Sequence, residues 1–184
     1  MTTYFEKAGD HTEEVLELAK KRAEELGIRD IVVASTTGRT GARASEVFRG
    51  YNLVVVTHQF GYKDPGTNEL LEEHRKEIEK NGGRILTCTH AFLGVERAIR
   101  KSMNTAYPVE VMAQALRMFG QGTKVAVEIA AMAADAGMIP HDRDVICIAG
   151  TGKGVDTALV IRPENSLRIF DLFVREIIAK PRDK

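Results

Sequence analysis

The sequence predicts an α/β protein, a three-layer α/β/α sandwich built on a mostly parallel sheet of about five strands with one antiparallel edge strand. Short runs rich in valine and isoleucine alternate with longer amphipathic segments. Apolar runs without polar alternation are typical of parallel strands that are covered on both faces. The length of 184 residues suits one sizeable core, so residues 1–184 are interpreted as a single domain.

The N-terminal segment predicts a helix followed by a buried strand. Asp10 and Glu13 have the spacing of a capping box, and apolar residues then recur at helical intervals until Gly27. This pattern predicts an added N-terminal helix. The run DIVVAS at 30–35 is short and apolar, which predicts a strand inside the sheet.

Two strand–helix–strand units account for the next part of the chain. Each apolar run is followed by a glycine-containing turn and then by an amphipathic segment, which is the pattern of parallel pairing through a helical crossover. The predicted elements are a helix at 42–49, a strand at 51–58, a helix at 68–80 and a strand at 84–89.

The C-terminal half predicts helices first and strands later. Helices are expected around GVERAIRKS, at 108–120 and at 122–137, and a strand at 144–150. The strand at 155–163 follows too closely for a parallel crossover, so it is expected to run antiparallel at the sheet edge. The tail LRIFDLFVREIIAK has a mostly helical pattern, although its first residues are also compatible with a strand.

Composition excludes several classes of protein. Acidic and basic residues balance at 26 each, so we expect no nucleic-acid partner. The N-terminus has no apolar leader and no run is long enough to span a bilayer, so we expect no membrane partner and a cytoplasmic location. Cys88 and Cys147 lack the spacing of a zinc site or a disulfide framework, which favours buried free thiols.

Ligands of open parallel sheets bind beyond the carboxyl ends of the strands. The loop after the first predicted strand is STTGRTGA, which combines hydroxyl groups, glycines, an arginine and the start of a helix. Free N–H groups at a helix N-terminus favour an anion, so phosphate is the expected guest. The alternative is an ordinary turn in which Thr36 or Thr40 only caps the helix.

The second glycine-rich loop, GTGKG at 150–154, is not a Walker P-loop. With Gly152 and Lys153 as the Gly-Lys pair, Cys147 stands where the first glycine is required and Gly154 stands where Ser or Thr is required. The loop joins two predicted strands, so its backbone N–H groups are suited to an anion nest with Lys153 as a point charge. A glycine-rich hairpin without a ligand remains the alternative.

Three further segments belong to the same predicted edge: HQFG after the second strand, Thr89 to Phe92 after the third, and the start of the helix near Gly122. The HQFG stretch after the second strand offers an imidazole, an amide and an aromatic face for a planar heterocycle, and His58 or His90 is a candidate acid or base. The candidate binding residues are Thr36, Thr37, Gly38, Arg39, Thr40, Gly41, His58, Gln59, Phe60, Thr89, His90, Gly122, Thr123, Lys124, Gly150, Thr151, Gly152, Lys153 and Gly154. No metal-ligand spacing, Gly-x-Ser-x-Gly elbow or Gly-x-Gly-x-x-Gly motif is present, and no catalytic nucleophile is identified.

VVASTTGRTGARASEVFRGYNLVVVTH and IAGTGKGVDTALVIRP resemble the C-terminal α/β domain of pyruvate kinase. In that family a strand leads to a loop with a Ser/Thr-Gly-Arg core, and a later glycine-rich loop precedes the last strand. The resemblance implies an α/β/α sandwich whose two loops, Thr36 to Thr40 and Gly150 to Gly154 here, bind the phosphate of a sugar-phosphate effector. The chain has no room for the catalytic barrel, so kinase activity is not implied.

The sequence is most similar to small stand-alone archaeal and bacterial proteins built on this domain. For that group the resemblance implies flavin mononucleotide (FMN) as the ligand, with its phosphate in the two loops and its ring beside His58 to Phe60. The chain is therefore expected to be a flavoprotein of unknown chemistry that binds a phosphorylated small molecule.

Three functions stay open from the sequence. A flavin-binding protein is the first, a sugar-phosphate-sensing regulatory module without catalysis is the second, and a small enzyme acting on a phosphorylated substrate is the third. The apolar stripe from Val109 to Phe119 is typical of core packing, and a homo-oligomer that buries it also stays open.

Overall fold

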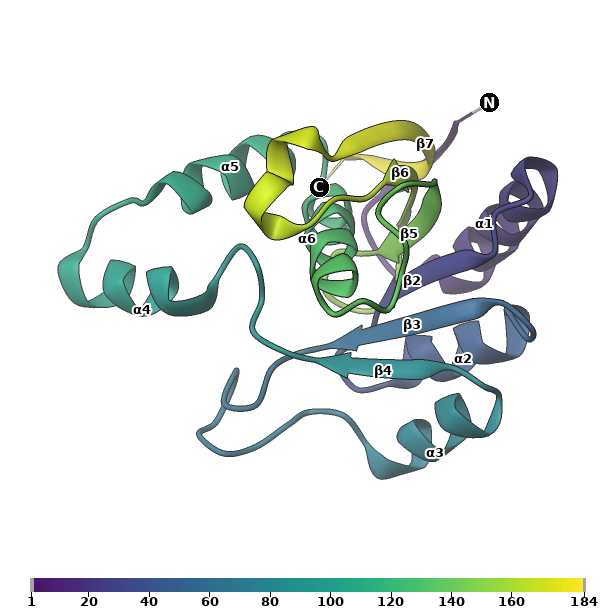
Figure 1. Ribbon diagram of the computed structural model, residues 1–184, viewed down its shortest axis with the longest axis horizontal. Helices are drawn as coiled ribbons and strands as arrows, with labels where there is room; N and C mark the ends of the chain where they lie inside the picture. The colour runs from purple at the N-terminus through teal and green to yellow at the C-terminus, as the bar shows by residue number, and fades with distance from the viewer. Residues whose placement is uncertain (1, 184) are drawn as a thin grey trace.

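The computed structural model describes residues 2–183 and places a seven-stranded sheet between two layers of helices (Figure 1). The strand order across the sheet is β1-β7-β6-β5-β2-β3-β4. The elements are β1 (Thr3–Lys7), α1 (Thr12–Leu26), β2 (Asp30–Ala34), α2 (Arg39–Val47), β3 (Asn52–Thr57), α3 (Glu72–Lys80), β4 (Arg84–Thr87), α4 (Gly94–Met103), α5 (Pro108–Arg117), α6 (Gln121–Asp135), β5 (Val145–Ala149), β6 (Thr157–Arg162), the 3-10 helix η1 (Ser166–Asp171) and β7 (Phe173–Asp183).

Alternate side chains of the buried strands pack into two separate cores. Ile31 and Val33 of β2 belong to the core that α1, α2 and α3 cover. Val32, between them, points to the opposite face and packs in the core that α6 covers. Because successive strand residues point to opposite faces, a strand apolar at every position is buried on both sides. The predicted three-layer sandwich is confirmed.

The central strands pair as the sequence predicts. β2 is parallel to β3 and to β5, and β3 is parallel to β4. β6 is antiparallel to β5, in agreement with the short connection between them. The sheet, however, has seven strands and not about five, because β7 and β1 continue it beyond β6. The antiparallel strand therefore lies inside the sheet and not at its edge.

The prediction that the C-terminal tail is mostly helical is wrong. Only the short 3-10 helix η1 forms, and the chain then continues as the eleven-residue strand β7. Val174 and Ile177 pack on one face of the sheet, whereas Ile178 and Ala179 pack on the other. Three β-branched residues, Val174, Ile177 and Ile178, and Pro181, which has no N–H for a helical bond, favour the extended conformation.

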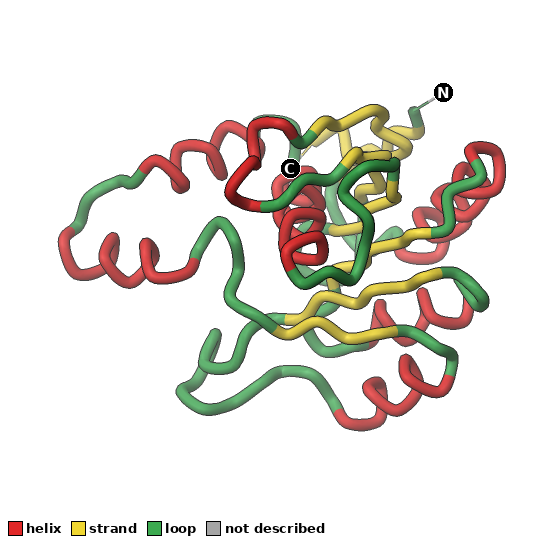
Figure 2. The backbone as a smooth tube through the Cα atoms, in the orientation of Figure 1, coloured by secondary structure: helices red, strands yellow, loops and turns green. Residues whose placement is uncertain are grey.

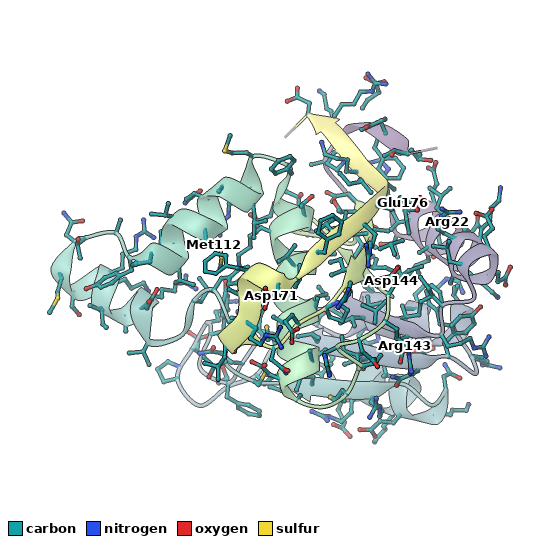
Figure 3. All side chains as sticks on the ribbon, turned by 45° about the horizontal axis from the view of Figure 1, so that its top comes forward. Arg22, Met112, Arg143, Asp144, Asp171 and Glu176 are labelled. Carbon is teal, nitrogen blue, oxygen red and sulfur yellow. The ribbon has the colours of Figure 1, made fainter. Side chains whose placement is uncertain are left out.

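The sequence also gave no sign of β1. This strand pairs in parallel with the end of β7, and Phe5 is its one buried side chain. Strand β7 is also tied to the helix layer, because the Arg22 guanidinium of α1 donates to the Glu176 carboxylate of β7 at 2.8–3.1 Å (Figure 3). One buried residue in five is too weak a pattern to identify a strand without its partner.

Helices α4 and α5 extend from the body on the side where β3 and β4 end (Figure 1). Long loops between β3 and α3 and between β4 and α4 lie on the same side (Figure 2). Helices α4 and α5 bring the charged side chains of Arg97, Arg100, Glu110 and Arg117 to the edge of the sheet where the parallel strands end.

The two cysteines are free. Cys147 is buried, as predicted, and Cys88 is partly buried. No helix within residues 2–183 is both long enough and apolar enough to cross a membrane.

Candidate functional site

A cleft of about 910 Å³ opens at the carboxyl ends of the parallel strands. Small-molecule sites commonly occupy about 300–1,000 Å³. Loops after β2, β3, β4 and β5 and the first turns of α6 line it. The sheet order therefore collects at one place segments that are far apart in the sequence, as the strand-end rule predicts.

The loop after β2 forms one wall of the cleft. Helix α2 begins at Arg39, directly after Gly38, whose φ of 92° is left-handed. The Ser35 hydroxyl accepts the N–H of Gly41 at 3.0 Å and so closes the turn. The first N–H groups of a helix have no partners inside the helix, so this wall is suited to an anion.

The glycine-rich loop between β5 and β6 lies next to that wall. Asp10 connects the two, because its carboxylate accepts from the Arg39 guanidinium at 2.5 Å and lies against Gly154. A Cβ on Gly154 would lie 2.0 Å from Asp10 Oδ1, so a larger residue there would have to displace the Asp10 carboxylate. Hydrogen bonds from Thr12 and Arg39 hold the pKa of Asp10 below its usual value. The sequence suggested Asp10 only as a helix cap.

Aromatic rings form the middle of the cleft. His58 stacks on Tyr62 with 3.9 Å between ring centroids, and the His90 ring lies 5.3 Å from His58, edge to face. Tyr62 lines the cleft, whereas Phe60 is 60% exposed and does not. Gln59 does not line the cleft, and its Oε1 accepts the N–H of His90 at 3.3 Å. The predicted aromatic face is thus supplied two residues later.

A buried ion pair lies at the start of α6. The Lys124 ammonium donates to the Glu128 carboxylate, and both side chains line the cleft at 3% and 5% exposure. Burial lowers the pKa of Lys124, and the charge of Glu128 opposes that shift. Glu128 also accepts the N–H of Phe92 at 2.8 Å. Since the two charges cancel, Lys124 adds no net attraction for an anion.

Several predicted residues lie behind the cleft and not in it. A Cβ on Gly122 would lie 2.2 Å from Thr157 Oγ1, and one on Gly41 would lie 2.5 Å from Val55 Cγ1. These glycines permit helices to pack closely on strands and do not expose backbone to a ligand. The predicted residues that do not line the cleft are Gly38, Gly41, Gln59, Phe60, Thr89, Gly122, Thr123 and Thr151.

The other predicted residues come together in the cleft: Thr36, Thr37, Arg39, Thr40, His58, His90, Lys124, Gly150, Gly152, Lys153 and Gly154. Polar or charged lining residues that the sequence did not suggest are Asp10, Thr57, Tyr62, Arg97, Arg100, Glu110, Arg117, Gln121 and Glu128, and Ser35 of the predicted loop lines the cleft as well. Those from α4 and α5 had no local signal, because an arginine on an amphipathic helix is usually solvated.

The cleft is positively charged although the chain is neutral overall. Its charged residues are Arg39, Arg97, Arg100, Arg117, Lys124 and Lys153 against Asp10, Glu110 and Glu128. Each carboxylate pairs with one cation. Within residues 2–183, Arg97, Arg117 and Lys153 have no ion-pair partner. The excess charge favours an anionic ligand.

No group of three or more potential metal ligands is found among residues 2–183.

Burial of His90 makes the stability of the protein dependent on pH. Its side chain is 9% exposed, its Nδ1 is buried without a hydrogen-bond partner within residues 2–183, and burial lowers its pKa from 6.5. The unfolded chain therefore binds this proton more readily than the folded protein. The stability that depends on neutral His90 is fully present above pH 6.5, the pKa of the unfolded chain. It is lost as the pH falls from there through the lower pKa of the folded protein.

We predict that His90→Gln reduces this loss. The measurement is urea unfolding at about pH 7.5 and about pH 5.5, with the free-energy difference between the two compared in wild type and variant. The lowered pKa of Asp10 acts further down the scale and does not interfere. An equal difference in both proteins would contradict the prediction.

Comparison with known proteins gives two kinds of similarity. The model of the pyruvate kinase alpha/beta domain matches residues 13–161. The solved pyruvate kinase of Cryptosporidium parvum in complex with ADP is 15% identical, with a TM-score of 0.40, over 84% of this chain and 23% of that chain. An O-ureido-L-serine synthase mutant bound to O-ureido-L-serine is 22% identical, with a TM-score of 0.31, over 70% of this chain and 40% of that chain.

Proposed function

The chain belongs to the pyruvate kinase alpha/beta domain family, and from this premise we propose that it binds a phosphorylated small molecule in the cleft at the carboxyl edge of the sheet. The observation that carries the proposal is the pair of loops joined by Asp10. They combine a helix N-terminus, left-handed glycines and the unpaired Lys153 in one wall of a positively charged cleft. Backbone N–H groups and a lysine charge together are a common phosphate cradle.

Within this proposal FMN is the first candidate ligand, as the resemblance to stand-alone members of the family implies. The residues present fit both of its parts. The wall from Thr36 to Thr40 with Gly150 to Gly154 would hold the phosphate, and the stacked His58 and Tyr62 would lie beside the ring. A bound flavin would supply redox chemistry, while these residues bind and orient it.

The proposal is tested first by the absorption spectrum of the purified protein and by mass spectrometry of any ligand released on denaturation. Flavin bands and released FMN would support the flavin. A colourless protein that releases a sugar phosphate, or is stabilised by sugar bisphosphates, would replace FMN by the regulatory ligand and keep the phosphate site. A protein that releases no ligand and binds none of these compounds would contradict the proposal.

We predict that Lys153→Ala and Thr37→Ala each weaken FMN binding by about tenfold or more, because each removes a contact to a charged phosphate. Riboflavin, which lacks the phosphate, should bind the variants and the wild type alike. Lys21→Ala, an exposed change on α1 outside the cleft, is the matched control. Titration calorimetry gives the affinities. Equal wild-type affinity for FMN and riboflavin would exclude a phosphate contact.

A further inference from the structure

His58 is held by contacts around its ring. Its Nδ1 lies 2.7 Å from Glu69 Oε2, and its Nε2 lies 3.4 Å from Thr36 Oγ1. Tyr62 stacks on one face, and the His90 ring approaches edge to face. Both His58 and Thr36 line the cleft. These contacts together fix the orientation of the ring.

Glu69 is itself fixed by its neighbour in the chain. The Asn68 side-chain amide donates to the backbone oxygen of His58 at 2.8 Å, and its oxygen accepts the N–H of Leu70 at 2.8 Å. The first bond anchors the segment to the residue after β3, and the second closes a turn around Glu69. The His58 and Glu69 side chains are 27% and 28% exposed, so water competes only partly for their hydrogen bond.

The contact with Glu69 selects one tautomer of the neutral ring. A carboxylate only accepts hydrogen bonds, so Nδ1 must carry the hydrogen. In the neutral ring Nε2 is then an acceptor, and it faces the Thr36 hydroxyl on the cleft wall. An acceptor nitrogen next to a bound ligand is the arrangement of a general base oriented by a third group.

We propose that the cleft catalyses proton transfer on a phosphorylated hydroxycarbonyl compound, with Nε2 of His58 as the base and Glu69 as its positioning residue. This inference rests on the proposed function, because the phosphate must be anchored for the reacting carbon to reach His58. The charged groups that face the histidines are Glu69, Arg97 across Tyr62, and the mutually neutralising Lys124 and Glu128 beside His90.

The step conserves atoms and electrons without an oxidant. His58 Nε2 takes the proton from the carbon next to the carbonyl, and the C–H electron pair forms the double bond of an enediolate whose charge lies on the carbonyl oxygen. His90 lies in the same cleft, and burial lowers its pKa. Return of the proton to the carbon that lost it gives the starting compound. Its delivery to the former carbonyl carbon gives the isomer, provided that the hydroxyl proton passes to the former carbonyl oxygen.

The test is exchange of carbon-bound hydrogen of dihydroxyacetone phosphate with deuterated water, followed by nuclear magnetic resonance. Wild type is expected to catalyse exchange, and His58→Gln to lower the rate by about 100-fold or more with unchanged affinity. Glu69→Gln should lower the rate and leave KM unchanged, because it loosens only the ring. His141→Gln, which is exposed and outside the cleft, is the matched control and should behave as wild type.

Binding of the same probe is measured by calorimetry in each variant, so that the two proposals can fail separately. Binding without exchange, or exchange that survives His58→Gln, would overturn the proton-transfer inference and leave the phosphate site standing. Failure of dihydroxyacetone phosphate, FMN and sugar bisphosphates alike to bind would overturn both. A Glu69→Gln effect on KM alone would assign Glu69 to binding and overturn its positioning role.

Discussion

Replacement of Lys124 by methionine is expected to lower the free energy of unfolding by about 3–5 kcal/mol. The variant keeps most of the length of the side chain and removes its charge, which leaves the Glu128 carboxylate buried without its cation. Glu128 is only 5% exposed, so water cannot replace the lysine. Its remaining bond, from the N–H of Phe92, does not balance a full charge. Urea unfolding of wild type and variant measures the loss.

A double variant separates lost charge balance from lost packing. In Lys124→Met with Glu128→Gln neither side chain is charged, and the glutamine oxygen can still accept the Phe92 N–H. This variant is expected to recover most of the stability, since neutral replacements of buried ion pairs are often tolerated. Lys101→Met, an exposed change on α4, should stay within about 0.5 kcal/mol of wild type. A single variant as stable as wild type would contradict the assigned ion pair.

The pair also shows how far the sequence leads at this site. Lys124 was predicted to bind a cofactor because it follows Gly122 at the start of a helix on the ligand edge. The structure confirms that Lys124 lines the cleft, yet its positive charge is neutralised by the Glu128 carboxylate. Glu128 lies one helical turn later, so the spacing was visible. The sequence did not show that the pair is buried, and burial is what turns such a pair from a minor surface contact into a strong constraint.

The fold could be predicted where burial leaves a local pattern. β2, β3 and β5 are apolar at nearly every position, because helices cover both of their faces. β1 and β7 have only part of their side chains buried, and their pairing joins the two ends of the chain. Pairing between residues so far apart in sequence leaves no local pattern, so both strands were missed.

The candidate site, too, could be predicted only where the sequence or the sheet topology leaves a pattern. Loops at strand ends were found because the topology of a parallel sheet fixes which edge they occupy. Arg97 and Arg117 were missed because they reach the cleft from α4 and α5, whose direction depends on tertiary packing. Tyr62 was missed in favour of Phe60, since the direction of a loop side chain is not encoded by its neighbours in sequence.

Gly38 leads to the second large effect, which is expected on both stability and ligand binding. Its φ is +92°, and a Cβ there would lie 2.6 Å from His74 Cβ and 2.6 Å from Leu70 Cδ1. Gly38→Ala thus combines a left-handed backbone with a clash against the segment that enters α3. Together these are expected to cost about 2–5 kcal/mol of unfolding free energy.

The same change should weaken binding of phosphorylated ligands by more than it weakens binding of riboflavin. Relief of the clash requires the start of α2 to move away from α3, and the N–H groups that form the proposed phosphate cradle move with it. Gly82→Ala is the matched control, because Gly82 has a φ of +86° but no atom within 4 Å of its added Cβ. It should show the backbone strain alone, with ligand affinity unchanged.

Urea unfolding and calorimetric titration with FMN, applied to both variants, test this prediction. If Gly38→Ala loses no more stability than Gly82→Ala, the close contact with His74 and Leu70 does not constrain the loop. If Gly38→Ala binds FMN as wild type does, the start of α2 is not part of the phosphate site. The ligand would then be held by the loop at Gly150 to Gly154, and Lys153→Ala would remain the variant that weakens binding.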